Sequence, residues 1–210
     1  MDAYNILLFM TDQHRFDVLG CMGNPIIDTP NLDRLAAEGT LFTNAYTACP
    51  SCIPARACLL TGMNQWHTGI LGMGEGQSEM GTNFRHTLPG ELATAGYYAK
   101  GIGKMHFFPQ RSLNGYHHIE LDESSRRKDP DFLSDYERWF HDHKTGEYGI
   151  ADGRDWNGWE GRPYDLPAFL HPNNWTAQQA LRFLNDRDRS MPFFLKVSFA
   201  RPHSPYDALP

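Results

Sequence analysis

Short apolar runs recur along the chain, and the first of them is followed by a polar cluster. Residues 5–10 form an apolar run followed by the polar residues 11–14, and residues 193–199 form a second run. Runs of this length are typical of buried strands. The segments 41–46 and 97–102 have the same character, so four strands are predicted. Polar residues at the carboxyl end of such strands are candidates for a site, because ligands bind at that edge of open α/β sheets.

Helical spacing of apolar residues alternates with these runs. It predicts helices at 30–38, 54–60, 87–95 and 175–184. Pro54 is expected at the first helical position, where the missing N–H of proline costs no hydrogen bond. The alternation predicts the α/β class, with a largely parallel sheet sandwiched by helices.

The pattern breaks down between residues 107 and 172, which are rich in Gly, Asp, Arg, His and Trp. A structureless loop of this length is unusual unless it has a function. We interpret the segment as an insertion over an active site. A solvated excursion with a small core of its own is the alternative, and the sequence does not decide between them.

Composition and charge exclude some classes of protein. The 210 residues are 40% hydrophobic with a formal net charge of -6, which fits one globular unit and argues against a general nucleic-acid binder. The apolar runs are far shorter than the roughly 20 residues that a membrane-spanning helix requires. The first residues lack a basic, signal-like region. We therefore expect a cytoplasmic location for the chain as written, or a periplasmic or secreted one if a leader has been removed.

The cysteines support two kinds of hypothesis. All four lie in the first third of the chain, which is too sparse for a disulfide scaffold. Cys49 and Cys52 have the CxxC spacing of a redox pair or of half a zinc site. A zinc site requires further ligands, which Cys21 and Cys58 do not supply at normal spacing.

The segment from Cys52 to Gly62 reads CIPARACLLTG. It resembles the signature of the type I sulfatases, CxPxR followed by LxTG, a family with an alkaline-phosphatase-like fold. The resemblance implies that Cys52 is oxidised to formylglycine by a maturing enzyme, and that Arg56 fixes the oxygens of this nucleophile. A group at a helix N-terminus also faces unpaired N–H donors, which favour an anion. Ala55 departs from the Ser that the family often has; a capped helix with a buried cysteine is the simpler alternative.

The resemblance extends to a metal site. It implies that Asp12 and Gln13, together with the modified Cys52, bind Ca²⁺, with Mg²⁺ or Mn²⁺ as other possibilities. Carboxylate and amide oxygens are hard ligands of the kind that calcium prefers. Gln13 replaces the usual second Asp and should weaken or retune binding. Taken alone, an Asp after a strand is more often a cap or turn residue.

Two later motifs match the same family. Residues 103–106, GKMH, resemble its GKxH element, which implies that Lys104 holds a sulfate oxygen and that His106 bonds the formylglycine hydrate and acts as a base. Residues 202–205, PHSP, resemble its PHxP element, which implies contact of His203 with the leaving oxygen and a role as general acid. Without the other family motifs, Lys104 and His106 would be interpreted as a surface pair and His203 as a histidine in a turn.

Several other residues are weaker candidates. His67 follows the LTG segment and either joins the site or packs on Trp66. Lys196 lies in an apolar strand, and we expect its ammonium group at the sheet edge. Within the candidate insertion, solvated loop positions are the simpler interpretation of a histidine pair and an arginine pair, and two tryptophans would suit stacking on a sugar: His117, His118, Arg126, Arg127, Trp156 and Trp159.

Together these motifs predict a sulfuric ester hydrolase acting on a sulfated small molecule or a sulfated sugar. A phosphonate monoester or phosphodiester hydrolase of the same superfamily is the alternative, and the GKxH element favours the sulfatase. Members of the family run well beyond 210 residues. We therefore expect residues 1–210 to be the N-terminal part of the catalytic domain, which by itself binds calcium poorly and turns over slowly, or to be a non-catalytic fragment. No pattern indicates an oligomeric state.

Overall fold

The computed structural model describes residues 3–73, 79–81, 84–144 and 158–210. A four-stranded parallel sheet in the order β1-β4-β2-β3 forms its centre. The strands are β1 (Ile6–Thr11), β2 (Tyr98–Gly103), β3 (His118–Leu121) and β4 (Phe193–Phe199). The helices of more than one turn are α1 (Pro30–Glu38), α2 (Cys52–Thr61), α4 (Leu88–Thr94), α5 (Asp135–His143) and α6 (Pro172–Asp186), and the shorter ones are α3 (Gln65–Thr68), η1 (Phe16–Val18), η2 (Gly20–Met22) and η3 (Ala168–Leu170).

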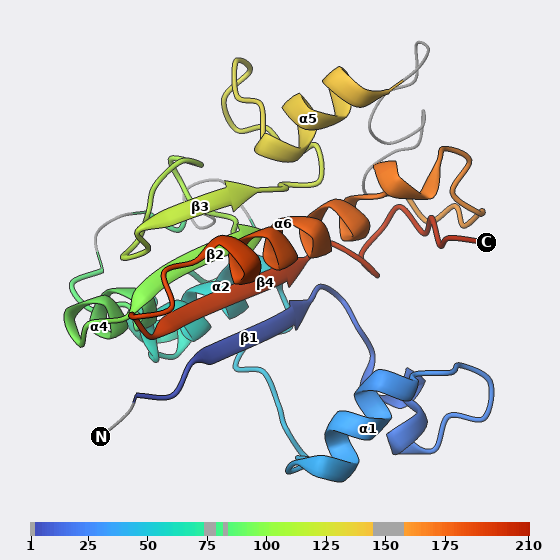
Figure 1. The fold of residues 1–210 in the computed structure, drawn as a ribbon, viewed down its shortest axis with the longest axis horizontal. Helices are drawn as coiled ribbons and strands as arrows, with labels where there is room; N and C mark the ends of the chain where they lie inside the picture. The colour runs from blue at the N-terminus through green and yellow to red at the C-terminus, as the bar shows by residue number, and fades with distance from the viewer. Residues whose placement is uncertain (1–2, 74–78, 82–83, 145–157) are drawn as a thin grey trace.

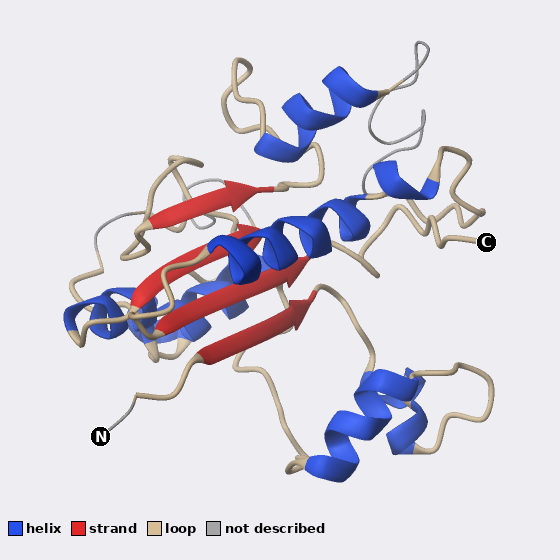
Figure 2. Ribbon diagram, in the orientation of Figure 1, coloured by secondary structure: helices blue, strands red, loops and turns tan. Residues whose placement is uncertain are grey.

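Helices cover both faces of this sheet (Figures 1 and 2). On one face α2 buries Ile53, Ala57 and Leu60 against the sheet, in a core that includes Phe194 of β4. On the opposite face α6 buries Ala180 and Phe183 against β2 and β4. The predicted α/β architecture with a parallel sheet between helices is therefore confirmed.

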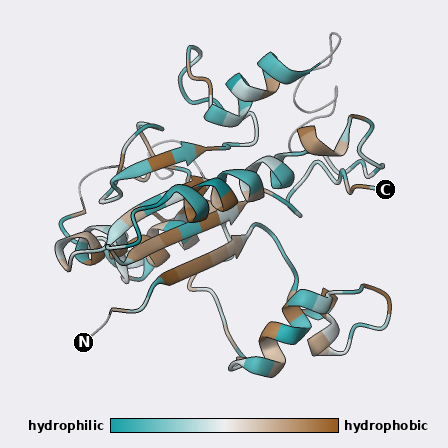
Figure 3. Ribbon diagram, viewed as in Figure 1, coloured by the Kyte–Doolittle hydropathy of each residue, from teal (hydrophilic) through white to brown (hydrophobic). Residues whose placement is uncertain are grey.

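Strand β1 forms the open edge of the sheet. Its side chains alternate between half-buried and exposed positions, and Leu7 and Phe9 are 42% and 59% exposed. Figure 3 shows this strand as a largely hydrophobic segment. Helix α1 lies away from the sheet, and none of its residues is buried (Figure 1). In the described part of the chain no helix is long and apolar enough to cross a membrane.

One strand prediction needs correction, and one strand was not predicted. The expected strand at 41–46 does not form: Phe42 and Tyr46 are 76% and 88% exposed, so these residues have neither a buried face nor a neighbouring strand. The segment 107–172, interpreted as an insertion, contributes the edge strand β3 and the helix α5. β3 escaped notice because it has only four residues, two of them polar.

Candidate functional site

The polar residues that follow three of the strands meet at the carboxyl edge of the sheet. Asp12 follows β1, Lys104 follows β2 and His203 lies beyond β4, while Cys52 starts the adjacent helix α2. A cavity of about 560 Å³ opens there. Its lining includes five of the predicted site residues: Asp12, Gln13, Cys52, Arg56 and His203.

Cys52 is the first residue of α2, so the helix begins two residues before the predicted start and Pro54 lies in its first turn instead of opening it. The side chain of the N-cap residue, Ser51, makes no capping hydrogen bond. The N–H groups of Cys52 and Ile53 at this terminus therefore remain suited to an anion. All four cysteines are free, so Cys49 and Cys52 do not form the disulfide of a redox pair here.

A single carboxylate joins the two cations of the site. Asp12 Oδ2 accepts a hydrogen bond from Arg56 Nη2 at 2.9 Å and lies 3.0 Å from Lys104 Nζ. Burial by itself raises the pKa of Asp12, but the charges of Lys104 and Arg56 outweigh it and leave the pKa below its usual value. Asp12 is therefore an anion at neutral pH.

Arg56 lies beneath the cavity floor, only 1% exposed. Besides Asp12, it donates to the backbone oxygen of Lys104 and to Ser198 Oγ, the latter at 2.9 Å. Its fork of donors thus connects α2 to the ends of β1, β2 and β4. In this arrangement Arg56 holds the Asp12 carboxylate and the backbone of Lys104.

The loop after β2 approaches β4 very closely. A Cβ atom added to Gly103 would lie 2.0 Å from the backbone oxygen of Ser198, and the φ of Gly103 is +91°. Only glycine fits this position. The backbone N–H of Lys104 then donates to the same oxygen at 2.9 Å, which places the Lys104 side chain next to Asp12.

His106 is buried, at 4% exposure, and its φ of +62° is unusual for a residue with a Cβ. Burial, followed by the charges of Lys104 and Arg56, holds the pKa of His106 well below its usual value. Its ring is therefore neutral at pH 7. Nδ1 of His106 is buried without a hydrogen-bond partner among the described residues.

His203 is half-buried at the cavity wall, with Nδ1 3.0 Å from the backbone oxygen of Ser204. Burial and then the charge of Lys104 lower the pKa of His203 below its usual value. His106 and His203 thus both lie close enough to Lys104 for its charge to lower their pKa values.

The cavity contains residues of the kind that bind a metal ion, but too few of them to complete its coordination shell. Asp12 and Gln13 supply oxygens at the cavity, and Gln13 is exposed with a φ of +56°. Calcium takes six to eight oxygen ligands. No group of three or more His, Cys, Asp or Glu side chains in the described ranges is placed to hold a metal ion, which also gives no support to a zinc site at Cys49 and Cys52.

Some sequence candidates lie outside the cavity. His67 is exposed on α3 and bonds Asn64, while Trp66 is 73% exposed instead of packing on it. In the segment 107–172, three of the candidates have structural contacts and one tryptophan is exposed to solvent. His117 Nδ1 accepts from the Ala99 N–H, His118 lies 3.6 Å from Glu120, Arg127 pairs with Glu137, and Trp159 is 85% exposed. Arg126 contributes to the lowered pKa of His106, and Trp156 lies outside the described residues.

Lys196 is not at the sheet edge as expected. It is 5% exposed in the middle of β4, beneath the site, and burial lowers its pKa to about 7. Sequence reasoning also missed Ser198, which bonds Arg56, and Glu123, whose carboxylate bonds the backbone of the loop that carries Lys104. No motif marks these residues; their burial in the folded sheet identifies them.

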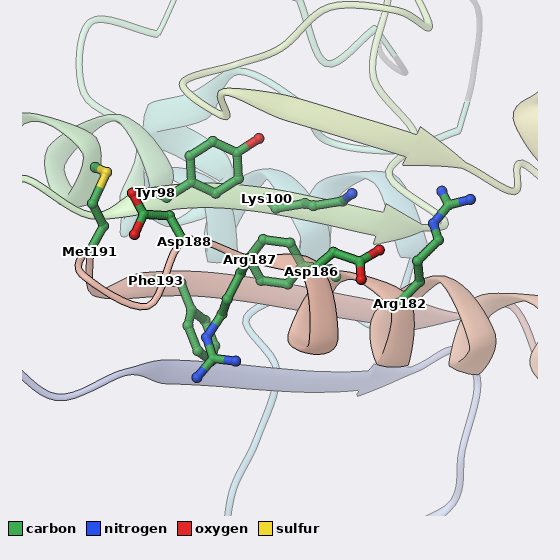
Figure 4. A pocket seen from close by; sticks show the side chains of 9 residues that line it. Tyr98, Lys100, Arg182, Asp186, Arg187, Asp188, Met191 and Phe193 are labelled. Carbon is green, nitrogen blue, oxygen red and sulfur yellow. The ribbon is translucent and has the colours of Figure 1, made fainter.

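Other hollows lie outside this cavity. One, of about 570 Å³, shares Thr11 and His14 with it and continues past Arg201 and Asp207. Another, of about 320 Å³, lies between α6 and the sheet (Figure 4). Its Lys100 and Arg182 are already paired with Glu120.

The fold and site define an α/β protein with a free cysteine at a helix N-terminus, and with a buried carboxylate paired to two cations at the same edge of the sheet. The family model described as Sulfatase matches residues 4–210. The chain belongs to the sulfatase family, which confirms the resemblance found in its motifs.

Characterised relatives agree with this membership. The chain is 45% identical to the arylsulfatase of Clostridium perfringens, over 97% of its own length and 44% of that protein. It is 32% identical to human N-acetylgalactosamine-6-sulfatase, over 96% of its length and 40% of that protein. The chain therefore spans less than half of the length of these relatives.

Solved structures have the same fold. A protein in complex with its substrate D-glucosamine-2-N,6-O-disulfate superposes with a TM-score of 0.68 at 28% identity, covering 96% of this chain and 35% of that one. The phosphonate monoester hydrolase of Agrobacterium radiobacter has a TM-score of 0.77 at 24% identity, covering 99% of this chain and 42% of that one, and at this identity it supports the fold alone.

Proposed function

We propose that this chain is the nucleophile-bearing part of a sulfatase that hydrolyses a sulfate ester to an alcohol and sulfate. The observation that carries the proposal is that Cys52, Asp12 and Arg56 line one cavity. The buried Lys104 pairs with Asp12 at this cavity. A sulfate group placed at this helix terminus faces N–H donors and nearby cations, both of which stabilise negative charge.

Each remaining side chain has a role that follows from its position. Lys104, held beside Asp12, supplies positive charge to a sulfate oxygen. His203, at the cavity wall, donates a proton to the leaving alcohol oxygen. His106 is held neutral and is able to accept a proton while sulfate is released.

Two groups that the family implies would complete this site. Conversion of Cys52 to formylglycine by a maturing enzyme supplies a hydrated aldehyde as the nucleophile, which a thiol does not provide. Asp12 and Gln13, with the oxygens of residue 52, would hold part of the shell of a calcium ion, whose charge polarises the sulfate. Both residues present are oxygen donors, and a complete shell requires ligands in addition to them.

The substrate class we propose is a sulfated sugar or a small aryl sulfate. The relatives include an arylsulfatase and a protein solved with a sulfated glucosamine substrate. The adjoining hollow of about 570 Å³, which shares Thr11 and His14 with the nucleophile cavity, provides space for the alcohol portion.

Turnover of a sulfate ester and of a phosphonate monoester by one preparation tests this proposal against the alternative of a phosphonate monoester hydrolase. We expect the chain, co-expressed with a formylglycine-maturing enzyme and assayed with calcium, to release 4-nitrophenol from 4-nitrophenyl sulfate faster than phenol from a phenyl phosphonate monoester. Cys52→Ala should abolish both, while Cys58→Ala, six residues further along α2, serves as the matched control. Preference for the phosphonate would identify the chain as a phosphonate monoester hydrolase instead.

A low absolute rate is expected for residues 1–210 by themselves, because Asp12 and Gln13 supply only part of a calcium shell. The ratio of the two rates, and their dependence on Cys52, therefore decide the question. Complete inactivity toward both substrates in a preparation with a converted residue 52 would support a non-catalytic fragment.

A further inference from the structure

A buried carboxylate that has no part in the proposed hydrolysis holds the loop between β2 and His106. Glu123 follows β3 and is 1% exposed. Its Oε1 atom accepts hydrogen bonds from the backbone N–H groups of Met105 at 2.9 Å and of His106 at 3.0 Å. Its Oε2 atom lies 3.3 Å from the His106 nitrogen.

The backbone of this loop explains why such a carboxylate is needed. Gly103 has a φ of +91° and His106 a φ of +62°. Successive N–H groups in a turn of this kind form a concave site for an anion, and here a side chain of the same protein fills it. A left-handed φ at His106 is unfavourable, so it persists only where the surroundings enforce it.

Nearby positive charges offset the cost of burying the Glu123 carboxylate. Burial raises the pKa of Glu123, whereas the two backbone hydrogen bonds and the charges of Arg56 and Lys104 oppose this shift. The charge of Glu123 in turn opposes the lowering of the Lys196 pKa by burial and by Arg56. An unpaired buried carboxylate would be costly, and these partners offset that cost.

We propose that Glu123 is a positioning residue: by accepting the N–H groups of Met105 and His106, it places the Lys104 ammonium beside Asp12 and His106 at the site. The catalytic consequence rests on the proposed function, whereas the structural consequence does not. The structure also offers a matched control. Glu120, on β3 itself, is similarly buried at 9% exposure but pairs with Lys100 and does not bond this loop.

Amide hydrogen exchange of the full chain, followed by NMR, tests the contact. In Glu123→Ala the Met105 and His106 amides should exchange at least about tenfold faster than in the wild type, because each loses a hydrogen bond to a charged acceptor. Glu123→Gln should restore most of the protection, since its amide oxygen still accepts. Glu120→Ala should leave both amides unchanged. Unchanged exchange in Glu123→Ala, or equal acceleration in Glu120→Ala, would overturn the proposal.

If Glu123→Ala does not fold, the contact is tested with Glu123→Gln instead. The amide protons of Met105 and His106 should then move upfield relative to Glu120→Gln, because a neutral amide is a weaker acceptor than a carboxylate. Amide shifts that stay at their wild-type values in Glu123→Gln would contradict the proposal.

Kinetics with 4-nitrophenyl sulfate on the same preparations test the catalytic consequence. Glu123→Ala should lower kcat by about tenfold or more with little change in KM, and Glu123→Gln should recover most of the loss. A loss in Glu120→Ala of the same size would indicate a general structural effect and overturn the positioning role. Absence of turnover in the wild type would count against the proposed function, while the exchange result would still decide on the Glu123 contact.

Discussion

The Oδ2 atom of Asp12 lies 3.0 Å from the Nζ atom of Lys104, so one ion pair joins the end of β1 to the loop after β2. Both side chains are buried, and Arg56 contacts the same oxygen from below. The Asp12 carboxylate is thus the shared counter-charge of two buried cations, and its residue also lines the cavity.

Asp12→Asn should therefore be among the most damaging substitutions. It leaves Arg56 and Lys104 facing each other without a counter-charge, which should lower the free energy of unfolding by about 3–5 kcal/mol. Urea denaturation measures this loss. Asp17→Asn is the matched control, because Asp17 forms an exposed pair with Arg15 and its loss should leave the unfolding midpoint unchanged. Equal effects of the two substitutions would show that the buried cluster is not a stabilising feature.

His203→Ala tests the proposed proton donor through the leaving group. An alkyl or sugar alcohol requires a proton as it departs, so loss of a general acid should slow its sulfate ester by about 10²–10⁴-fold. 4-Nitrophenolate leaves without a proton, so 4-nitrophenyl sulfate should be affected much less. The ratio of kcat values for the two substrates is the measurement. A uniform loss on both would assign His203 to binding instead.

Lys196→Met should change how stability depends on pH. The folded-state pKa of Lys196, about 7, lies below its unfolded value of 10.5, so the unfolded chain binds the additional proton between these values. The free energy of unfolding therefore rises with pH in this window, by up to about 1.4 kcal/mol per pH unit, and is insensitive to this group below pH 7.

Urea denaturation between pH 6 and 9.5 checks this dependence. The difference in unfolding free energy between the wild type and Lys196→Met should grow in favour of the wild type as the pH rises. Lys144→Met is a suitable control because Lys144 is partly exposed at the end of α5. A difference that does not vary with pH would show that Lys196 is charged in the folded protein.

The strands and motifs of the site were predictable because their signals are local. An apolar run followed by Asp12 indicates a strand and its edge, and the offsets within CxPxR and GKxH identify Cys52, Arg56, Lys104 and His106. The parallel sheet then brings these residues to one edge, as the structure shows. The family match confirms the interpretation of the motifs, while the roles of the individual residues stay predictions.

Features that depend on packing were not predictable. β3 is too short and too polar to be recognised from the sequence. Glu123 follows β3, so its contact with the loop that carries Lys104 could not be predicted either. Lys196 looks like a surface residue until the helix α2 covers its face of β4. Residues 41–46 have the composition of a strand but no neighbouring strand to pair with. Each of these outcomes depends on contacts between distant parts of the chain.

Tandem mass spectrometry of the tryptic peptide 35–56 tests directly whether Cys52 becomes formylglycine. This peptide contains Cys49 and Cys52, so the first is an internal control for the second. After co-expression with a formylglycine-maturing enzyme, the account predicts a loss of about 18 Da at residue 52, reactivity of that residue toward a carbonyl reagent, and an unchanged Cys49. An unmodified thiol at residue 52, in a culture where a control sulfatase is converted, would contradict the account.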